Sequence, residues 1–89
     1  EQIRDNLKSY KMKVEILSPD TLIFEGEATS LRLPGKDGSF GILNNHAPII
    51  STLVEGNVEL TDEGGNTKEF AINGGVVEVL QNKVIVLSD

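Results

Sequence analysis

The fold is decided by the C-terminal stretch Val76-Val77-Glu78-Val79-Leu80-Gln81-Asn82-Lys83-Val84-Ile85-Val86-Leu87. It holds two runs rich in β-branched residues on either side of a polar pair. Such runs favour extended structure, and a two-residue connection between them is typical of a β-hairpin. Asparagine tolerates the left-handed backbone of a tight turn, so we place Asn82 in that conformation. The stretch therefore predicts two paired strands.

The same alternation extends towards the N-terminus. Apolar side chains recur at every second position in four further segments, which predicts that one face of each segment points into a core. The expected inward pairs are Val14 and Ile16, Leu31 and Leu33, Val58 and Leu60, and Phe70 and Ile72.

Turn residues separate these segments. We expect turns at 18–20 and 62–66, a strand end at 55–56, a tight reversal at Asn73-Gly74-Gly75, and an exposed loop over the breaker cluster Pro34-Gly35-Lys36-Asp37-Gly38. This spacing predicts an all-β chain of roughly ten short strands, a single-domain antiparallel β-sandwich or barrel over residues 12–89. Residues 1–11 precede it as an N-terminal extension that we expect to be flexible.

The composition argues against several classes of binding partner. The chain has 89 residues, enough for one core, and 8 basic against 14 acidic residues give a net charge of -6. The basic residues are scattered, so we expect no nucleic-acid partner. Without cysteine there are no disulfides. No apolar run reaches the ~18 residues of a membrane span, so we expect no direct membrane insertion.

The search for catalytic chemistry finds little. One His and no Cys argue against a zinc site, and the Asp62 hairpin lacks the ligand spacing of a calcium loop. His46 is a conceivable general base, with Ser39 or Ser51 as nucleophile, but sequence supplies no geometry for them. We therefore expect no catalytic residue, cofactor, metal or small-molecule substrate, and favour a protein that binds other proteins.

Three stretches, in the same order and spacing, resemble the epsilon subunit of F-type ATP synthases. The central one is Gly38-Ser39-Phe40-Gly41-Ile42-Leu43-Asn44-Asn45-His46-Ala47-Pro48-Ile49-Ile50, similar to that family's Gly-x-x-Gly-Ile and His-Ala-Pro motifs. The others are 14–20 with 24–27, and 73–79 with 84–89. The resemblance covers about residues 12–89.

The resemblance implies a ten-stranded β-sandwich in the central stalk of a proton-translocating ATP synthase. Such a subunit grips gamma, rests on the membrane c ring and performs no chemistry, and it lies peripherally on the cytoplasmic face of the bacterial inner membrane. By position, the c-ring contacts are Asp37, Gly38, Ser39 and Phe40. The gamma contacts are Ser18, His46 and Ser51. An apolar face covered by gamma is expected to be exposed in the isolated domain.

Longer family members continue into a helical hairpin that can inhibit ATP hydrolysis. This sequence stops before it, so we expect the chain as given not to inhibit hydrolysis that way. The alternative function is a small-ligand module such as a carbohydrate-binding sandwich, although one Tyr, three Phe and no Trp offer little for the aromatic platform of such a site. An enzyme is the third alternative.

Overall fold

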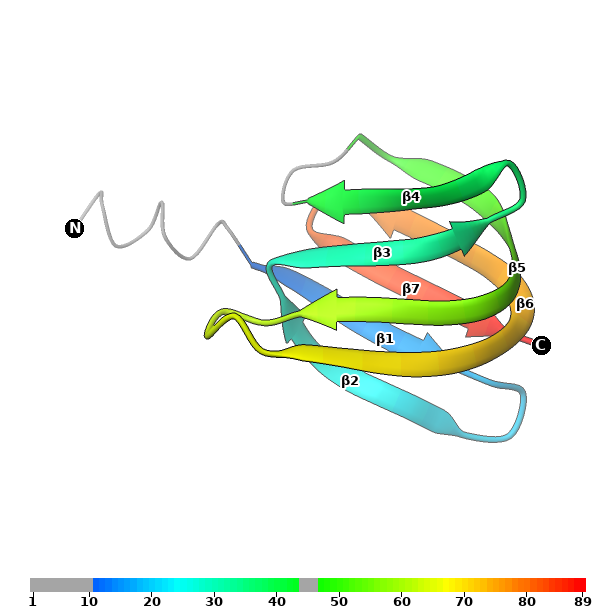
Figure 1. The fold of residues 1–89 in the computed structure, drawn as a ribbon, viewed down its shortest axis with the longest axis horizontal. Coiled ribbons are helices and arrows are strands. Elements are labelled where there is room, and N and C mark those ends of the chain that lie inside the picture. Colours follow the sequence, from blue (N-terminus) through cyan, green and yellow to red (C-terminus); the bar gives the residue numbers. More distant parts are fainter. Residues whose placement is uncertain (1–10, 44–46) are drawn as a thin grey trace.

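The computed structural model describes residues 11–43 and 47–89, and all its regular structure is β-strand (Figure 1). Seven strands follow one another along the chain, rather than the roughly ten predicted. They are β1 (Met12–Leu17), β2 (Leu22–Ala28), β3 (Ser30–Gly35), β4 (Gly38–Leu43), β5 (Ile49–Thr61), β6 (Thr67–Leu80) and β7 (Lys83–Ser88). The all-β prediction is confirmed for the described residues.

The lower strand count arises because two predicted breaks lie inside long strands. The expected end at Gly56 falls within β5, and the expected reversal at Asn73-Gly74-Gly75 falls within β6. Pairing between these strands continues past both points, from Leu53 opposite Gly75 to Asn57 opposite Ala71. The positive φ angles of Gly74 (117°) and Gly75 (143°) bend β6 without ending it. The prediction of a reversal there is therefore wrong.

All seven strands form one sheet in the order β2-β1-β7-β6-β5-β3-β4. Neighbours are antiparallel except β1 and β7, which pair in parallel from Lys13 opposite Lys83 to Leu17 opposite Leu87. The expectation of a wholly antiparallel sheet is wrong for this pair, because the first and last strands lie side by side and run the same way. The sheet is open, with β2 and β4 at its edges, and Figure 1 shows it folded over on itself with β3 and β4 in front of β7 and β1.

The core lies between the two halves of the folded sheet. Its fully buried members come from all seven strands and follow the period of two that the sequence predicted. They are Met12, Val14, Ile16, Ala28, Leu31, Leu33, Ile42, Leu53, Val58, Leu60, Ile72, Val77, Val79, Val84 and Val86. Seven of the eight predicted inward residues are among them, and Phe70 packs against this cluster half-buried. The centre of its ring lies 5.0 Å from that of Phe24, so side-chain packing connects β2 to β6, two strands that are not paired through backbone hydrogen bonds.

The turns match the predicted places with two corrections. Only Lys36 and Asp37 lie between β3 and β4, so the loop predicted over 34–38 is a two-residue turn with its flanking residues in strands. The hairpin between β6 and β7 is confirmed, but the left-handed residue is Gln81 (φ 56°) and not Asn82. In the β5–β6 turn the Asp62 carboxylate accepts backbone hydrogen bonds from Gly64 and Asn66, both at 2.9 Å.

Candidate interaction face

A row of mostly apolar side chains crosses the outer surface of five strands. Each member lies directly opposite the next on the neighbouring strand, so the row is continuous from β2 to β5. We call it the apolar stripe, and it consists of Leu22, Leu17, Leu87, Val76 and Thr52. Three of its apolar members are exposed, Leu22 at 50%, Leu87 at 49% and Val76 at 38%, while Leu17 is half-buried.

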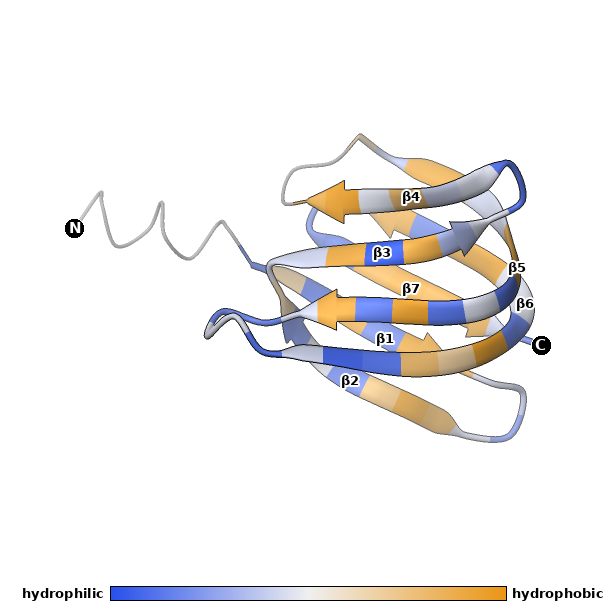
Figure 2. Ribbon diagram, viewed as in Figure 1, coloured by the Kyte–Doolittle hydropathy of each residue, from blue (hydrophilic) through white to orange (hydrophobic). Residues whose placement is uncertain are grey.

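Figure 2 places hydrophobic colour at the ends of β1, β2 and β7 that lie on the side of the C-terminus. Two further apolar residues of β5 are exposed beside the stripe, Ile50 at 75% and Val54 at 42%. Large exposed apolar groups that adjoin one another mark interaction sites more often than scattered ones do. The exposed apolar patch expected from the sequence is therefore present in the described residues.

The opposite outer surface is polar. On β3, the second half of β5 and the first half of β6, Arg32 lies opposite Glu59, which lies opposite Glu69. Arg32 donates a hydrogen bond to the Ser39 hydroxyl at 3.0 Å, and Asn57 donates one to Glu69 at 3.2 Å. Figure 2 shows the start of β6 in hydrophilic colour and this part of β5 in alternating hydrophilic and hydrophobic colour. The two outer surfaces therefore differ in chemistry, and only one suits an apolar partner.

Two of the residues expected to contact gamma adjoin the stripe in the chain. Ser18 follows Leu17, and its hydroxyl donates a hydrogen bond to the Thr21 carbonyl at 3.4 Å. Ser51 precedes Thr52 and is half-buried on the inward-facing side of β5, opposite Val77. The third, His46, lies outside the described residues.

The residues expected to contact the c ring surround the β3–β4 turn. Asp37, Gly38 and Ser39 are exposed, and Phe40 is half-buried. They line a hollow of about 480 Å³ whose other side includes Ser51. The structure thus brings together residues that the sequence assigned to two different partners. A backbone hydrogen bond of 3.2 Å from Lys36 to the Thr52 carbonyl fixes the turn to the end of the stripe.

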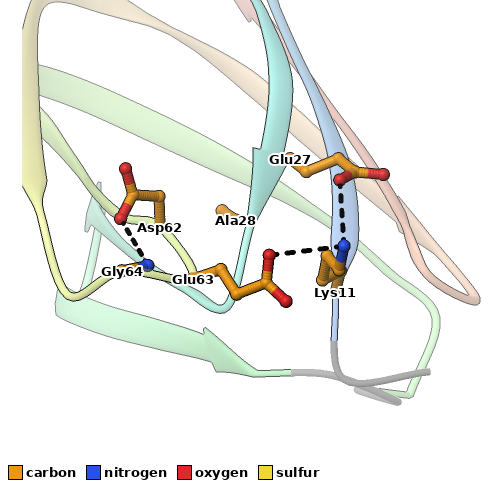
Figure 3. A pocket seen from close by; sticks show the side chains of 6 residues that line it. All are labelled: Lys11, Glu27, Ala28, Asp62, Glu63 and Gly64. Atoms are coloured by element: carbon orange, nitrogen blue, oxygen red, sulfur yellow. Dashed lines mark hydrogen bonds and ion pairs between the residues drawn. The ribbon is translucent and has the colours of Figure 1, made fainter. Parts of the chain in front are cut away.

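A second hollow, of about 320 Å³, lies between the start of β1, the end of β2 and the β5–β6 turn (Figure 3). The Lys11 ammonium lies 3.4 Å from a Glu63 carboxylate oxygen and 3.6 Å from one of Glu27. The hydrogen bond and charge of Glu63, then the charge of Glu27, raise the pKa of Lys11. This cluster ties three segments together, and across 11–43 and 47–89 no group of three or more His, Cys, Asp or Glu side chains is arranged to hold a metal ion.

The stripe was only partly visible in the sequence. The runs 76–80 and 84–87 are apolar at outward as well as inward positions, a pattern typical of strands covered on both faces. The sequence could not show which strands lie side by side. It therefore predicted an apolar face without locating Leu22 or Leu87 on it.

Residues 11–89 match the protein family described as "ATP synthase, Delta/Epsilon chain, beta-sandwich domain". The chain belongs to this family. The resemblance seen in the sequence is thus confirmed. No helix in the described part of this delta/epsilon-family chain is long and apolar enough to cross a membrane.

Its relatives include epsilon chains of several bacteria. The ATP synthase epsilon chain of Leptospira interrogans is 40% identical over 83 residues, covering 93% of this chain and 65% of the relative. That of Sulfurimonas denitrificans is 46% identical over 77 residues, covering 86% and 59%. That of Chlorobium limicola is 42% identical over 77 residues, covering 86% and 88%. The delta/epsilon-family chain thus spans less than two thirds of the first two relatives.

Two solved assemblies contain chains of the same fold. One is the OSCP/F1/c-ring of the Euglena gracilis mitochondrial ATP synthase, with a TM-score of 0.84, 21% identity, and coverage of 89% of this chain and 51% of that one. The other is the central stalk and c-ring of the Tetrahymena thermophila mitochondrial ATP synthase, with a TM-score of 0.70, 17% identity, and coverage of 86% and 62%. At these identities the likeness concerns the fold.

Proposed function

We propose that the chain is the non-catalytic rotor subunit of a proton-translocating F-type ATP synthase, which binds the gamma subunit and the c ring and helps couple ion flow to ATP synthesis. The observation that carries the proposal is the match to bacterial epsilon chains along nearly the whole chain. A subunit in that place is held peripherally at the cytoplasmic face of the bacterial inner membrane.

The gamma subunit is the proposed occupant of the apolar stripe. Full burial of a Leu side chain contributes about 1.5–3 kcal/mol relative to full exposure, so the half-exposed Leu22 and Leu87 have roughly 1 kcal/mol each left to gain in a complex. Ser18 adjoins the stripe and is proposed to contribute a polar contact beside it. Ser51 faces inward on β5, away from the stripe, so its proposed contact with gamma rests on the sequence resemblance alone. His46 remains a proposed gamma contact from the sequence resemblance.

The β3–β4 turn is the proposed contact with the c ring. The turn is short, and the two strands that flank it pair along their length, from Gly35 opposite Gly38 to Ser30 opposite Leu43. The exposed Asp37 carboxylate therefore lies at the end of a rigid hairpin. Rigidity suits a subunit that transmits torque. Asp37, Gly38, Ser39 and Phe40 are therefore proposed to meet the polar loops of the c ring.

Titration calorimetry of the chain against the gamma subunit of the same organism tests the proposal. We expect one-to-one binding, weakened about tenfold or more by Leu87→Arg, because a buried charge in an apolar contact costs more than 1.4 kcal/mol. Leu43→Arg is the matched control, since Leu43 is also an exposed leucine (64%) but lies on β4, away from the stripe.

The two outcomes lead to different functions. If a folded wild-type chain does not bind gamma, the rotor role is wrong, and the alternative function of a small-ligand binding sandwich is favoured. The structure offers little support for that alternative, because Phe24, Phe40 and Phe70 all pack against the core instead of forming an exposed platform. For the c-ring contact, Asp37→Arg is expected to reduce ATP-driven proton pumping by the reconstituted enzyme while gamma binding is retained.

A further inference from the structure

Beside the apolar stripe lies a second row of outward residues, and three of its five members are carboxylates with no ion-pair partner among the described residues. The next set of outward positions lies two residues from the stripe on β5, β6, β7 and β1 and three residues from it on β2, and its members are also neighbours across the sheet. We call this set the acidic row, and it consists of Ile50, Glu78, Ile85, Glu15 and Glu25. Within the described part of the chain, no ion pair forms with the carboxylates of Glu78, Glu15 or Glu25.

The arrangement is unfavourable for the isolated domain. Glu15 lies directly opposite Glu25 on an antiparallel pair of strands, and like charges in that position repel. Lys13 and Lys83 line the same hollow as Glu15 and Glu25, but among the described residues no ion pair joins them, and such a local violation of a stability rule is typical of functional surfaces. A cationic group on a bound partner would relieve this repulsion.

The third row has the opposite sign on β1 and β7, while on β2 Glu27 lies opposite Lys13. Lys13 lies opposite Lys83, and both side chains are exposed. On β1 and β7 each step between rows is two residues, or about 7 Å in an extended strand. Along β1 the outward side chains therefore change from apolar Leu17 to acidic Glu15 to basic Lys13, and their neighbours on β7 are Leu87, Ile85 and Lys83.

We propose that the surface of the gamma subunit that covers the stripe is an apolar ridge bordered by Lys or Arg side chains, which face the acidic row, with acidic groups beyond them facing Lys13 and Lys83. The inference rests on the proposed function and specifies the partner's chemistry. Such alternating charges set the orientation of docking and accelerate encounter more than they raise affinity. The apolar stripe supplies the burial, and the charged rows fix the register.

A second copy of the chain does not satisfy this surface. If two copies stack stripe on stripe about a two-fold axis along the strands, acidic row meets acidic row. If the axis runs along the stripe, the acidic row meets the opposite flank, where the exposed Asp89 follows Leu87 by two residues. Like charges meet in both arrangements, which costs binding energy.

Association kinetics with the gamma subunit of the same organism test the inference. Glu25→Lys reverses one charge of the acidic row. Its matched control is Glu69→Lys on the polar surface, because Glu69 also lies opposite a glutamate, Glu59, and the change in net charge is identical. Each variant turns a like-charged cross-strand pair into an attractive one, and Glu69→Lys also removes the exposed hydrogen bond from Asn57, so both are expected to melt close to wild type, and melting curves test for misfolding.

We expect Glu25→Lys to slow association about tenfold at 0.01 M salt, and the difference to shrink at 0.15 M, where the screening length falls from roughly 30 to 8 Å. Glu69→Lys is expected to remain within about twofold of wild type. If gamma binds but Glu25→Lys associates as fast as Glu69→Lys, the inference is wrong while the rotor role survives. No binding by wild-type chain would refute both.

Discussion

Replacing Gly75 with alanine tests the bend that turns β6 from one half of the folded sheet to the other. Gly75 has φ 143°, a conformation that residues with a side chain rarely adopt. A Cβ atom there would lie 1.9 Å from the Leu87 carbonyl oxygen and 3.0 Å from the Ser88 Cα on β7. Both contacts are with backbone, so no side-chain rotation relieves them.

The expected loss has two parts. Strain of a non-glycine residue in this region costs about 1–3 kcal/mol, and forcing an extra carbon into a packed contact costs about 1–3 kcal/mol. The sum is about 2–6 kcal/mol. A domain of 89 residues has a total stability of roughly 4–13 kcal/mol, so Gly75→Ala removes a large share of it.

Urea denaturation followed by circular dichroism measures this loss. Gly65→Ala is the control, because Gly65 also has a positive φ (83°) but a Cβ there would meet nothing within 4 Å. It isolates the backbone strain and is expected to cost about 1–2 kcal/mol. Equal losses in the two variants would show that the approach of β7 to Gly75 is not what demands glycine, and the account of the bend would fail.

Two further predictions concern the core and the Lys11 cluster. Leu33→Ala removes a fully buried side chain and is expected to lower the free energy of unfolding by about 2–5 kcal/mol, measured by urea titration. Leu43→Ala, on the exposed side of β4, is expected to change it by less than about 0.5 kcal/mol. Similar losses in the two variants would contradict the assigned core. Lys11→Met is expected to lower the melting temperature at neutral pH. Because Glu63 and Glu27 raise the folded-state pKa of Lys11 above its ordinary 10.5, its contribution is complete below pH 10.5 and disappears as the pH rises through the raised value. A difference between Lys11→Met and wild type that persists unchanged in strongly alkaline melts would argue against the ion pairs.

Much of the local structure could be predicted because it depends on neighbours in the chain. The inward positions of Val14, Leu31 and Val58 follow from alternation alone, and the β6–β7 hairpin follows from two β-branched runs around a polar pair. The wrong prediction of a reversal at Gly74 and Gly75 has a physical cause. Glycine signals a positive φ, but a positive φ serves a bend as well as a reversal, and only the pairing of β6 with β5 and β7 distinguishes them.

Part of the candidate site could likewise be predicted from the sequence, and part could not. The β3–β4 turn was visible in the sequence because Pro34 to Gly38 hold strong turn residues, although its length was overestimated. The sequence could not show that Ser51 lies near that turn, because the Lys36–Thr52 hydrogen bond joins the turn to β5, a separate strand of the sheet.

The sequence by itself determined that the chain is all-β, which side chains enter the core, and which family it belongs to, because these depend on residue types and their spacing. Tertiary structure alone decided the parallel pairing of β1 with β7 and, through it, the assembly of Leu17, Leu87 and Val76 into one stripe beside the opposed carboxylates of Glu15 and Glu25. The physical reason is that backbone hydrogen bonds between strands carry no residue code, so their order is fixed only when every strand has buried its apolar face in the common core.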